Sequence, residues 1–101
     1  MKSSPVAIIT GASGTTGRAL ALGFAQKGFA VAGVDIDPVG LKELESAWLP
    51  WYSEFAAFTG DLQDPAFLLF LVDATIKKWG RIDVLINNAA WRTLETLRTI
   101  S

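Results

Sequence analysis

Four short, mostly apolar runs are spaced along the chain, separated by longer stretches of mixed polarity. The runs are Val6–Thr10, Phe29–Asp35, Phe55–Thr59 and Ile82–Asn87. Their length suits β-strands, and apolar residues at successive positions are typical of strands that are covered on both faces. We therefore predict four buried strands over these ranges.

The stretches between the runs carry apolar residues at helical spacing. We expect helices over Thr15–Lys27, from Asp37-Pro38 to Leu49-Pro50, and from Asp64-Pro65 to Gly80. Aspartate followed by proline suits an N-cap and the first helical position, and glycine commonly ends a helix. The third helix has a wide apolar face, made by Phe67, Leu68, Leu71, Val72, Thr75 and Ile76. A last stretch, Thr93–Ile100, begins a further helix.

Strands that alternate with helices indicate a parallel sheet with right-handed crossovers. We predict an α/β fold, a doubly wound parallel sheet of about four strands in the order 3-2-1-4, with helices on both faces. The chain has 101 residues, a length that favours one domain over residues 1–101.

Composition narrows the chemistry that such a domain can perform. The chain carries 9 Lys+Arg and 10 Asp+Glu, a formal net charge of -1, so it lacks the basic surface of a nucleic-acid binder. It has no Cys and no His, which excludes disulfides, a Ser-His-Asp triad and thiolate or imidazole metal ligands. The longest apolar run, 66–72, is far shorter than the roughly 20 residues of a membrane span. With no signal-peptide pattern, we expect a cytoplasmic protein without a membrane partner.

A glycine-rich loop joins the first strand to the first helix. It reads Thr10-Gly11-Ala12-Ser13-Gly14-Thr15-Thr16-Gly17. Gly11 permits a sharp turn, Gly14 lets the backbone approach a diphosphate, and Gly17 lets the helix lie close to the sheet. The helix N-terminus offers unpaired amides to an anion, and Ser13, Thr15 and Thr16 add hydroxyl groups. The alternative is a plain tight turn between strand and helix.

An acidic residue, Asp35, ends the second predicted strand. In a dinucleotide-binding fold, a carboxylate there accepts hydrogen bonds from the adenosine ribose hydroxyls and repels a 2′-phosphate. No Arg or Lys lies in the glycine loop or directly after Asp35. NAD is therefore favoured over NADP as the cofactor. The alternative is a solvated loop acid or a helix cap, although Asp37 is better placed to cap the helix.

Four segments together resemble the N-terminal part of a short-chain dehydrogenase/reductase, which has a Rossmann-like fold. They are the glycine loop, Asp35, Gly60-Asp61-Leu62 and the stretch from Gly80 to Ala90 that contains Asn87-Asn88-Ala89. The resemblance implies that Asp61 binds the adenine amino group, that Leu62 packs beside the ring, and that Asn87, Asn88 and Ala89 line the adenosine side. The expected cofactor contacts are Gly11, Ser13, Gly14, Thr15, Thr16, Gly17, Asp35, Ile36, Asp61, Leu62, Asn88, Ala89 and Ala90.

Two residues depart from the pattern of this family. Thr15 occupies the place of the family's usual second glycine, so that the loop reads TGxxGxxG, and Ala90 replaces the usual glycine after Asn-Asn-Ala. The loop spacing is similar to that of extended and atypical branches of the family, whereas the Asn-Asn-Ala turn is similar to the common branch. This mixture leaves open a non-catalytic NAD(P)-binding sensor, and also an interaction domain that keeps the fold without a ligand.

The resemblance implies hydride transfer between nicotinamide and a carbonyl or alcohol, with a Tyr acid/base, a Lys four residues later and a Ser. The only tyrosine here is Tyr52, and Ala56 stands four residues after it. We therefore expect no catalytic residue in this chain and no turnover by the chain alone. A small-molecule substrate is expected only if a C-terminal half completes a truncated fold. Without that half, we expect the fourth strand to be an exposed edge, with Arg81 and Asp83 near its start, and a site of self-association.

Overall fold

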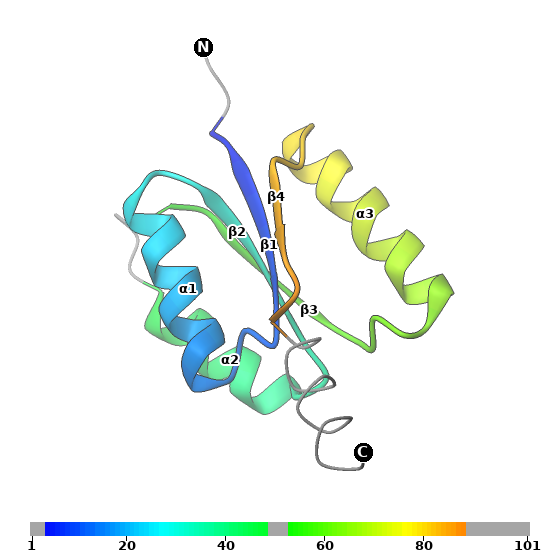
Figure 1. Cartoon of the computed structure of the whole chain (residues 1–101), viewed down its shortest axis with the longest axis horizontal. Helices are drawn as coiled ribbons and strands as arrows, with labels where there is room; N and C mark the ends of the chain where they lie inside the picture. The colour runs from blue at the N-terminus through cyan, green and yellow to red at the C-terminus, as the bar shows by residue number, and fades with distance from the viewer. Residues whose placement is uncertain (1–3, 49–52, 89–101) are drawn as a thin grey trace, which may run out of the picture.

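The structure is a computed structural model, and it describes residues 4–48 and 53–88 (Figure 1). Strands and helices alternate in the predicted order. The elements are β1 (Val6–Thr10), α1 (Thr15–Gln26), β2 (Ala30–Asp35), α2 (Pro38–Ala47), β3 (Phe55–Thr59), α3 (Pro65–Trp79) and β4 (Val84–Ile86). The expected helix caps are present, because the side chains of Asp37 and Asp64 accept hydrogen bonds from the N–H groups of Val39 and Ala66. Gly80 ends α3 in the left-handed conformation.

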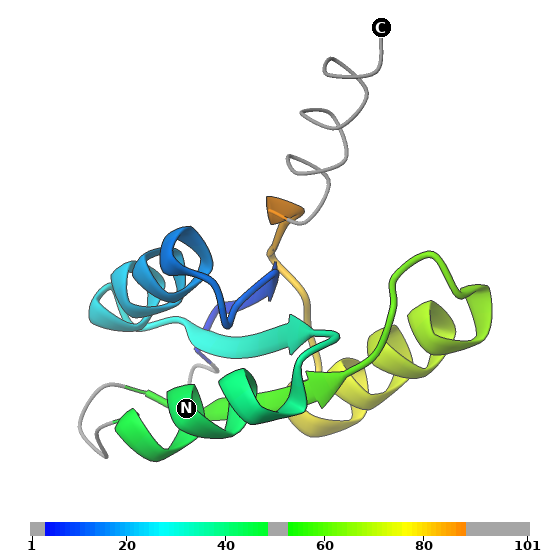
Figure 2. The ribbon, with the colours of Figure 1, turned by 90° about the horizontal axis from the view of Figure 1, so that it is seen from below.

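The four strands form one parallel sheet in the order β3-β2-β1-β4, as predicted. Ala7 pairs with Val31 of β2 on one side and with Val84 of β4 on the other. Helices α1 and α2 cover one face of the sheet, and α3 lies on the opposite face (Figure 2). This is the doubly wound arrangement, with β1 at its centre.

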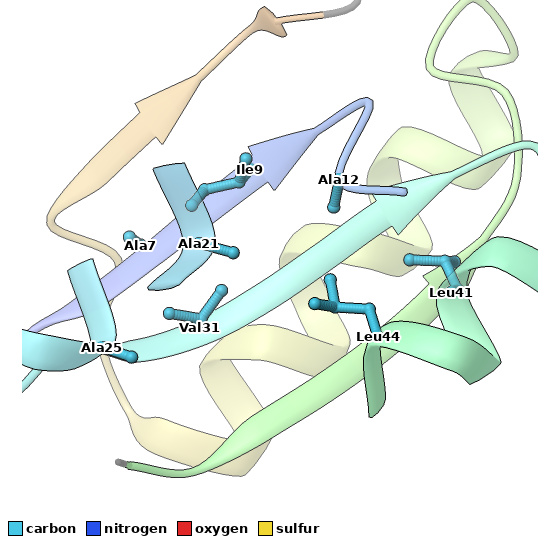
Figure 3. Close-up of a cluster of buried hydrophobic side chains, with 8 residues drawn as sticks. All are labelled: Ala7, Ile9, Ala12, Ala21, Ala25, Val31, Leu41 and Leu44. Carbon is cyan, nitrogen blue, oxygen red and sulfur yellow. The ribbon is translucent and has the colours of Figure 1, made fainter. Parts of the chain in front are cut away.

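Each face of the sheet has its own hydrophobic core. Successive strand residues point to opposite faces, so Ala7 and Ile9 lie in one core and Ile8 in the other. The core beneath α1 and α2 contains Ala7, Ile9, Ala12, Ala21, Ala25, Val31, Leu41 and Leu44 (Figure 3). The core beneath α3 contains Ile8, Ala32, Val34 and Leu71. Burial on both faces explains why β1 and β2 are apolar up to their last residues, Thr10 and Asp35.

Trp48 packs against β3, the strand at one edge of the sheet. The Trp48 ring packs against Phe55 with 4.6 Å between ring centroids, and its indole N–H donates to the Ser53 carbonyl at 2.8 Å. Two further aromatic residues, Trp51 and Tyr52, lie outside the described ranges.

The last strand is shorter than its apolar run, because β4 begins at Val84 and not at Ile82. Asp83 supplies the reason. Its Oδ2 accepts a hydrogen bond from the Val6 N–H at 2.8 Å, and its own N–H donates to the Val6 carbonyl at 2.9 Å. The carboxylate thus replaces a backbone carbonyl in the ladder, and the regular strand starts one residue later. Arg81 binds the same carboxylate, with its Nη2 2.7 Å from Oδ1.

Asp83→Ala should lower the melting temperature by several degrees at pH 7, because the Val6 N–H loses its acceptor. The hydrogen bond from Arg81, together with that from the Val6 N–H, lowers the pKa of Asp83. The stabilisation is therefore complete above the unfolded-state pKa, near 3.8, and is lost as the pH falls through the lower folded-state value. Thermal unfolding from pH 7 to pH 2 should show the wild-type and variant curves converging at acid pH.

The control for this experiment is Asp73→Ala, which breaks only an exposed pair with Lys77 at 3.0 Å. We expect little change from it at any pH. A constant difference between wild type and Asp83→Ala down to pH 2 would contradict an ionised Asp83 as the source of the stabilisation.

Helix α3 is covered over only part of its predicted apolar face. Leu71 and Thr75 are buried against the sheet. Large apolar side chains remain exposed on α3 and β4: Leu68, Leu69, Phe70, Val72, Ile76 and Leu85. Most of the exposed large apolar side chains among the described residues therefore lie on the α3 side of the sheet. Self-association through β4 stays a prediction. None of the helices within the described residues is both long enough and apolar enough to cross a membrane.

Candidate functional site

The segments that carry the predicted site meet at one edge of the sheet, where all four parallel strands end (Figure 1). The Gly60 N–H, after β3, donates to the Asp35 carbonyl of β2 at 3.0 Å. The Asn88 side-chain amide, after β4, lies 3.4 Å from the Gly11 carbonyl of the glycine loop. Residues distant in sequence are thus brought together at the carboxyl ends of the strands, where ligands bind in open α/β sheets.

The glycine loop makes a sharp turn from β1 into α1. Gly11 has φ 65°, in the left-handed region that favours glycine. A Cβ atom on Gly17 would overlap the Gly11 carbonyl oxygen and would lie 2.8 Å from the Ala12 Cα. Glycine at these two positions therefore allows the turn and the close packing of helix on loop, in agreement with the sequence interpretation.

The N-terminus of α1 differs from those of α2 and α3. Its N-cap residue, Gly14, has no side chain to accept a hydrogen bond from the first turn, whereas Asp37 and Asp64 cap the other two helices. Thr15 and Thr16 are exposed in this first turn. Thr15 has a negative φ, so threonine fits the backbone in place of the family's glycine. The first amides of α1 can therefore serve an anionic group.

Asp35 is buried at the end of β2, with only 8% of its surface exposed. Its Oδ2 accepts hydrogen bonds from the Ser13 hydroxyl at 2.6 Å and the Ser13 N–H at 3.1 Å, and its Oδ1 accepts from the Asp37 N–H at 3.1 Å. Burial would raise the pKa of Asp35, but the hydrogen bonds from Ser13, Asp37 and Ile36 hold that pKa below its ordinary value. Asp35 is therefore a fixed carboxylate, and neither a solvated loop acid nor the cap of α2.

Two residues that the sequence did not single out hold the loop in place. The Arg18 Nε donates to the Ser13 carbonyl at 2.8 Å, and its Nη2 lies 3.3 Å from both the Gly40 carbonyl and the Glu43 carboxylate. A Cβ atom on Gly40 would lie 2.6 Å from the Ser13 Cβ. A glycine inside a helix was the available signal for this close approach, because it costs stability unless packing requires it.

The remaining predicted residues lie around the same edge. The Thr10 hydroxyl is 3.1 Å from the Asn87 Oδ1, which ties the glycine loop to the end of β4. The Asp61 Oδ1 accepts from the Gln63 N–H at 2.9 Å, so this carboxylate also shapes its own turn. Leu62 packs partly buried on the α3 core, and Ile36 is 72% exposed. Ala89 and Ala90 lie outside the described residues.

Comparison with known proteins identifies the family. The model of the short chain dehydrogenase family matches residues 5–101. The chain belongs to the short-chain dehydrogenase family. Among its relatives in this family is D-threitol dehydrogenase of Mycolicibacterium smegmatis, which is 32% identical over 96 residues, covering 95% of this chain and 37% of the relative.

Solved structures of short-chain dehydrogenases share the observed fold. NAD+-bound xylitol dehydrogenase matches 80% of this chain and 31% of its own, with a TM-score of 0.75 and 30% identity. L-sorbose reductase from Gluconobacter frateurii, complexed with NADPH and L-sorbose, matches 85% of this chain and 33% of its own chain, with a TM-score of 0.77 and 29% identity. The present chain thus spans about a third of the length of these short-chain dehydrogenases.

Proposed function

We propose that residues 1–101 form the NAD-binding unit of a short-chain oxidoreductase. The observation that carries the proposal is Asp35, a buried carboxylate fixed beside the glycine loop by two hydrogen bonds from Ser13. The cofactor, when bound, supplies hydride exchange with a carbonyl or alcohol. The residues of this chain bind and orient it.

The residues present fit a dinucleotide at three points. The uncapped first turn of α1, with Gly14, Thr15 and Thr16, suits the diphosphate, because amide N–H groups and the helix dipole favour an anion. Asp35 suits the adenosine ribose, and Asp61 suits the adenine amino group. The exposed apolar side chain of Ile36 and the partly buried side chain of Leu62 would give the adenine ring an apolar border.

The charges around the ribose position favour NAD over NADP. Asp35 is ionised and would repel a 2′-phosphate. Arg18 lies nearby but contacts the carbonyls of Ser13 and Gly40 and pairs with Glu43. Its guanidinium is thus engaged in bracing the loop. This arrangement supports a preference for NAD, with NADP as the weaker ligand.

Substrate turnover is proposed to need residues that this chain does not supply. The chain covers about a third of the length of its relatives, and its sequence holds one tyrosine, Tyr52, with no lysine four residues later. General-acid catalysis is worth roughly 10²–10⁴-fold in rate. The substrate class is a small carbonyl or alcohol compound, bound when a catalytic portion is present.

The test is to titrate the pure chain with NADH and, separately, with NADPH. Binding is measured by isothermal titration calorimetry and by tryptophan fluorescence. We expect saturable binding of NADH, at least about tenfold tighter than that of NADPH, which corresponds to about 1.4 kcal/mol. The same samples should show no oxidation of NADH in the presence of a simple ketone. Absence of NADH binding would overturn the proposed function, and steady turnover would overturn its non-catalytic part.

A further inference from the structure

We infer that the outer edge of β3, together with Phe70 of α3, is an interface through which two copies of this chain associate. The two β3 strands would pair antiparallel about a two-fold axis at Ala57, so that the two sheets become one. This inference does not rest on the proposed function, because neither β3 nor Phe70 was assigned to the cofactor.

The outer edge of β3 offers main-chain groups to a further strand. Among the described residues, β3 pairs with β2 alone and ends the sheet (Figure 2). Glu54 and Gly60 both hydrogen-bond to β2 through main-chain groups, each at 3.0 Å. Because the direction of these groups alternates along a strand, the N–H and C=O groups that point away from β2 are those of Phe55, Ala57 and Thr59. Such a row of groups is a template for strand pairing.

The β3 strand lacks the features that protect natural sheet edges. Its five residues include no charged residue and no proline, and Ala57 and Thr59 are exposed. The opposite edge of the sheet differs, because β4 has only three residues and the ion pair of Arg81 with Asp83 stands at its start. The structure therefore favours β3 over β4 as the edge that pairs with another chain.

An exposed aromatic side chain lies beside this edge on the α3 face. Phe58 of β3 packs edge-on against Phe70 of α3, with 6.2 Å between ring centroids, and the Phe67 ring lies 6.3 Å from that of Phe70. Despite these contacts, 57% of Phe70 remains exposed. Phenylalanine is enriched at protein interfaces, so Phe70 suits an anchor next to the paired strands.

A second copy of the chain fits this edge, because the strand is complementary to itself. When Ala57 lies opposite Ala57 of the second copy, Phe55 lies opposite Thr59 and Thr59 opposite Phe55. The outward N–H of each of these residues then meets an outward C=O, as in the hydrogen-bonded pairs of an antiparallel ladder. The two-fold axis stands perpendicular to the sheet, so both α3 helices lie on the same face and the two Phe70 side chains flank the paired strands.

Charge and size define the expected dimer. In this register Glu54 comes opposite Gly60 and Asp61 comes opposite Ser53, so no two acidic residues face each other directly. The net charge of -1 per chain adds little long-range repulsion. One short strand and one aromatic side chain per copy form an interface at the low end of specific contacts, below about 1,200 Å² in total. We therefore expect a weak dimer with a micromolar dissociation constant.

Sedimentation velocity of the whole chain, from micromolar to submillimolar concentration, tests the interface. The wild type should shift from monomer to dimer over this range. Ala57→Lys and Ala57→Glu each place like charges opposite one another at the axis, and each should weaken the dimer at least about tenfold. An equal mixture of the two variants should restore the dimer, because the facing charges then have opposite signs. Leu85→Lys, at an exposed position on β4, is the matched control and should leave the dimer unchanged.

Hydrogen exchange of the wild type locates the contact without any substitution. The outward N–H of Ala57 should exchange more slowly as the dimer forms, whereas exchange at Ala56, whose N–H faces β2, should not change. A wild-type chain that stays monomeric would overturn the inference, even if β3 takes up an added extended peptide. A dimer that Ala57→Lys leaves intact, that Leu85→Lys abolishes, or that the mixture of folded variants fails to restore would overturn it as well. Circular dichroism establishes that each variant is folded.

Discussion

Asp35→Arg should weaken NADH binding by about 100-fold while weakening NADPH binding much less, so that the preference between the two cofactors moves toward NADPH. The substitution removes the acceptor of the ribose hydroxyls, and hydrogen bonds to a charged group are worth about 1.5–3 kcal/mol. It also replaces a repelling carboxylate with a guanidinium that can pair with a 2′-phosphate. The measurement is the ratio of the two dissociation constants, obtained by calorimetry on the same protein preparation.

The controls separate loss of the ribose contact from loss of the fold. Asp35 is buried and accepts three hydrogen bonds, so the thermal unfolding of each variant must be recorded. Asp35→Asn keeps the size of the side chain, removes the charge and should give a smaller loss in the same direction. Glu45→Arg makes the same charge change at an exposed position on α2 and should leave the ratio unaltered. Unchanged NADH affinity in a folded Asp35→Arg protein would exclude Asp35 from the ribose site.

Gly17→Ala should be the most destabilising single-methyl change in the glycine loop. The added Cβ would overlap the Gly11 carbonyl oxygen and sit 2.8 Å from the Ala12 Cα, and both are backbone atoms that cannot rotate away. Helix α1 must then move off the loop, and we expect a loss of about 3 kcal/mol in the free energy of unfolding. Domains of this size have a total of about 5–15 kcal/mol, so a large fraction of the stability is at stake.

Gly23→Ala is the matched control, because it lies on the same helix and, apart from its chain neighbours and the nearby backbone of α1, no atom lies within 4 Å of the added Cβ. There the methyl group should stabilise the protein by about 0.5–1 kcal/mol through helix propensity. Urea denaturation of both variants gives the two free energies. Equal stabilities would show that α1 can shift away from β1 without cost, contrary to the packing described above.

The sequence was sufficient for most of the fold because its signals are local. The runs Val6–Thr10 and Phe55–Thr59 became β1 and β3 with the same bounds, and the Asp-Pro pairs began two helices as expected. The last strand was predicted too long because its start depends on a contact between Asp83 and Val6, 77 residues apart. No periodicity within the run reveals that a side chain replaces a main-chain acceptor.

In the candidate site, too, the residues with local signals could be predicted, and those that depend on contacts between distant segments could not. Its glycines and Asp35 could be recognised because each lies beside a strand end, where the chemistry of a dinucleotide limits the choice of residue. Arg18 and Gly40 were missed because their importance arises from the packing of α2 against the loop, across 22 positions of sequence. Likewise, the hydrogen bond from Ser13 to Asp35 joins two residues that were each predicted, but separately.

The central place of β1 has a consequence for the order in which the chain folds. One edge of β1 pairs with β2, which follows soon after β1 in the sequence. The other edge of β1 pairs with β4, which lies near the end of the described residues. The loop to be closed for the second pairing is about three times longer, which adds roughly 1 kcal/mol of closure entropy. During synthesis, β1, α1 and β2 can form a local unit before β4 has been synthesised. The slow step of folding should therefore be the arrival of β4, and refolding should resemble that of other proteins with many contacts between distant segments.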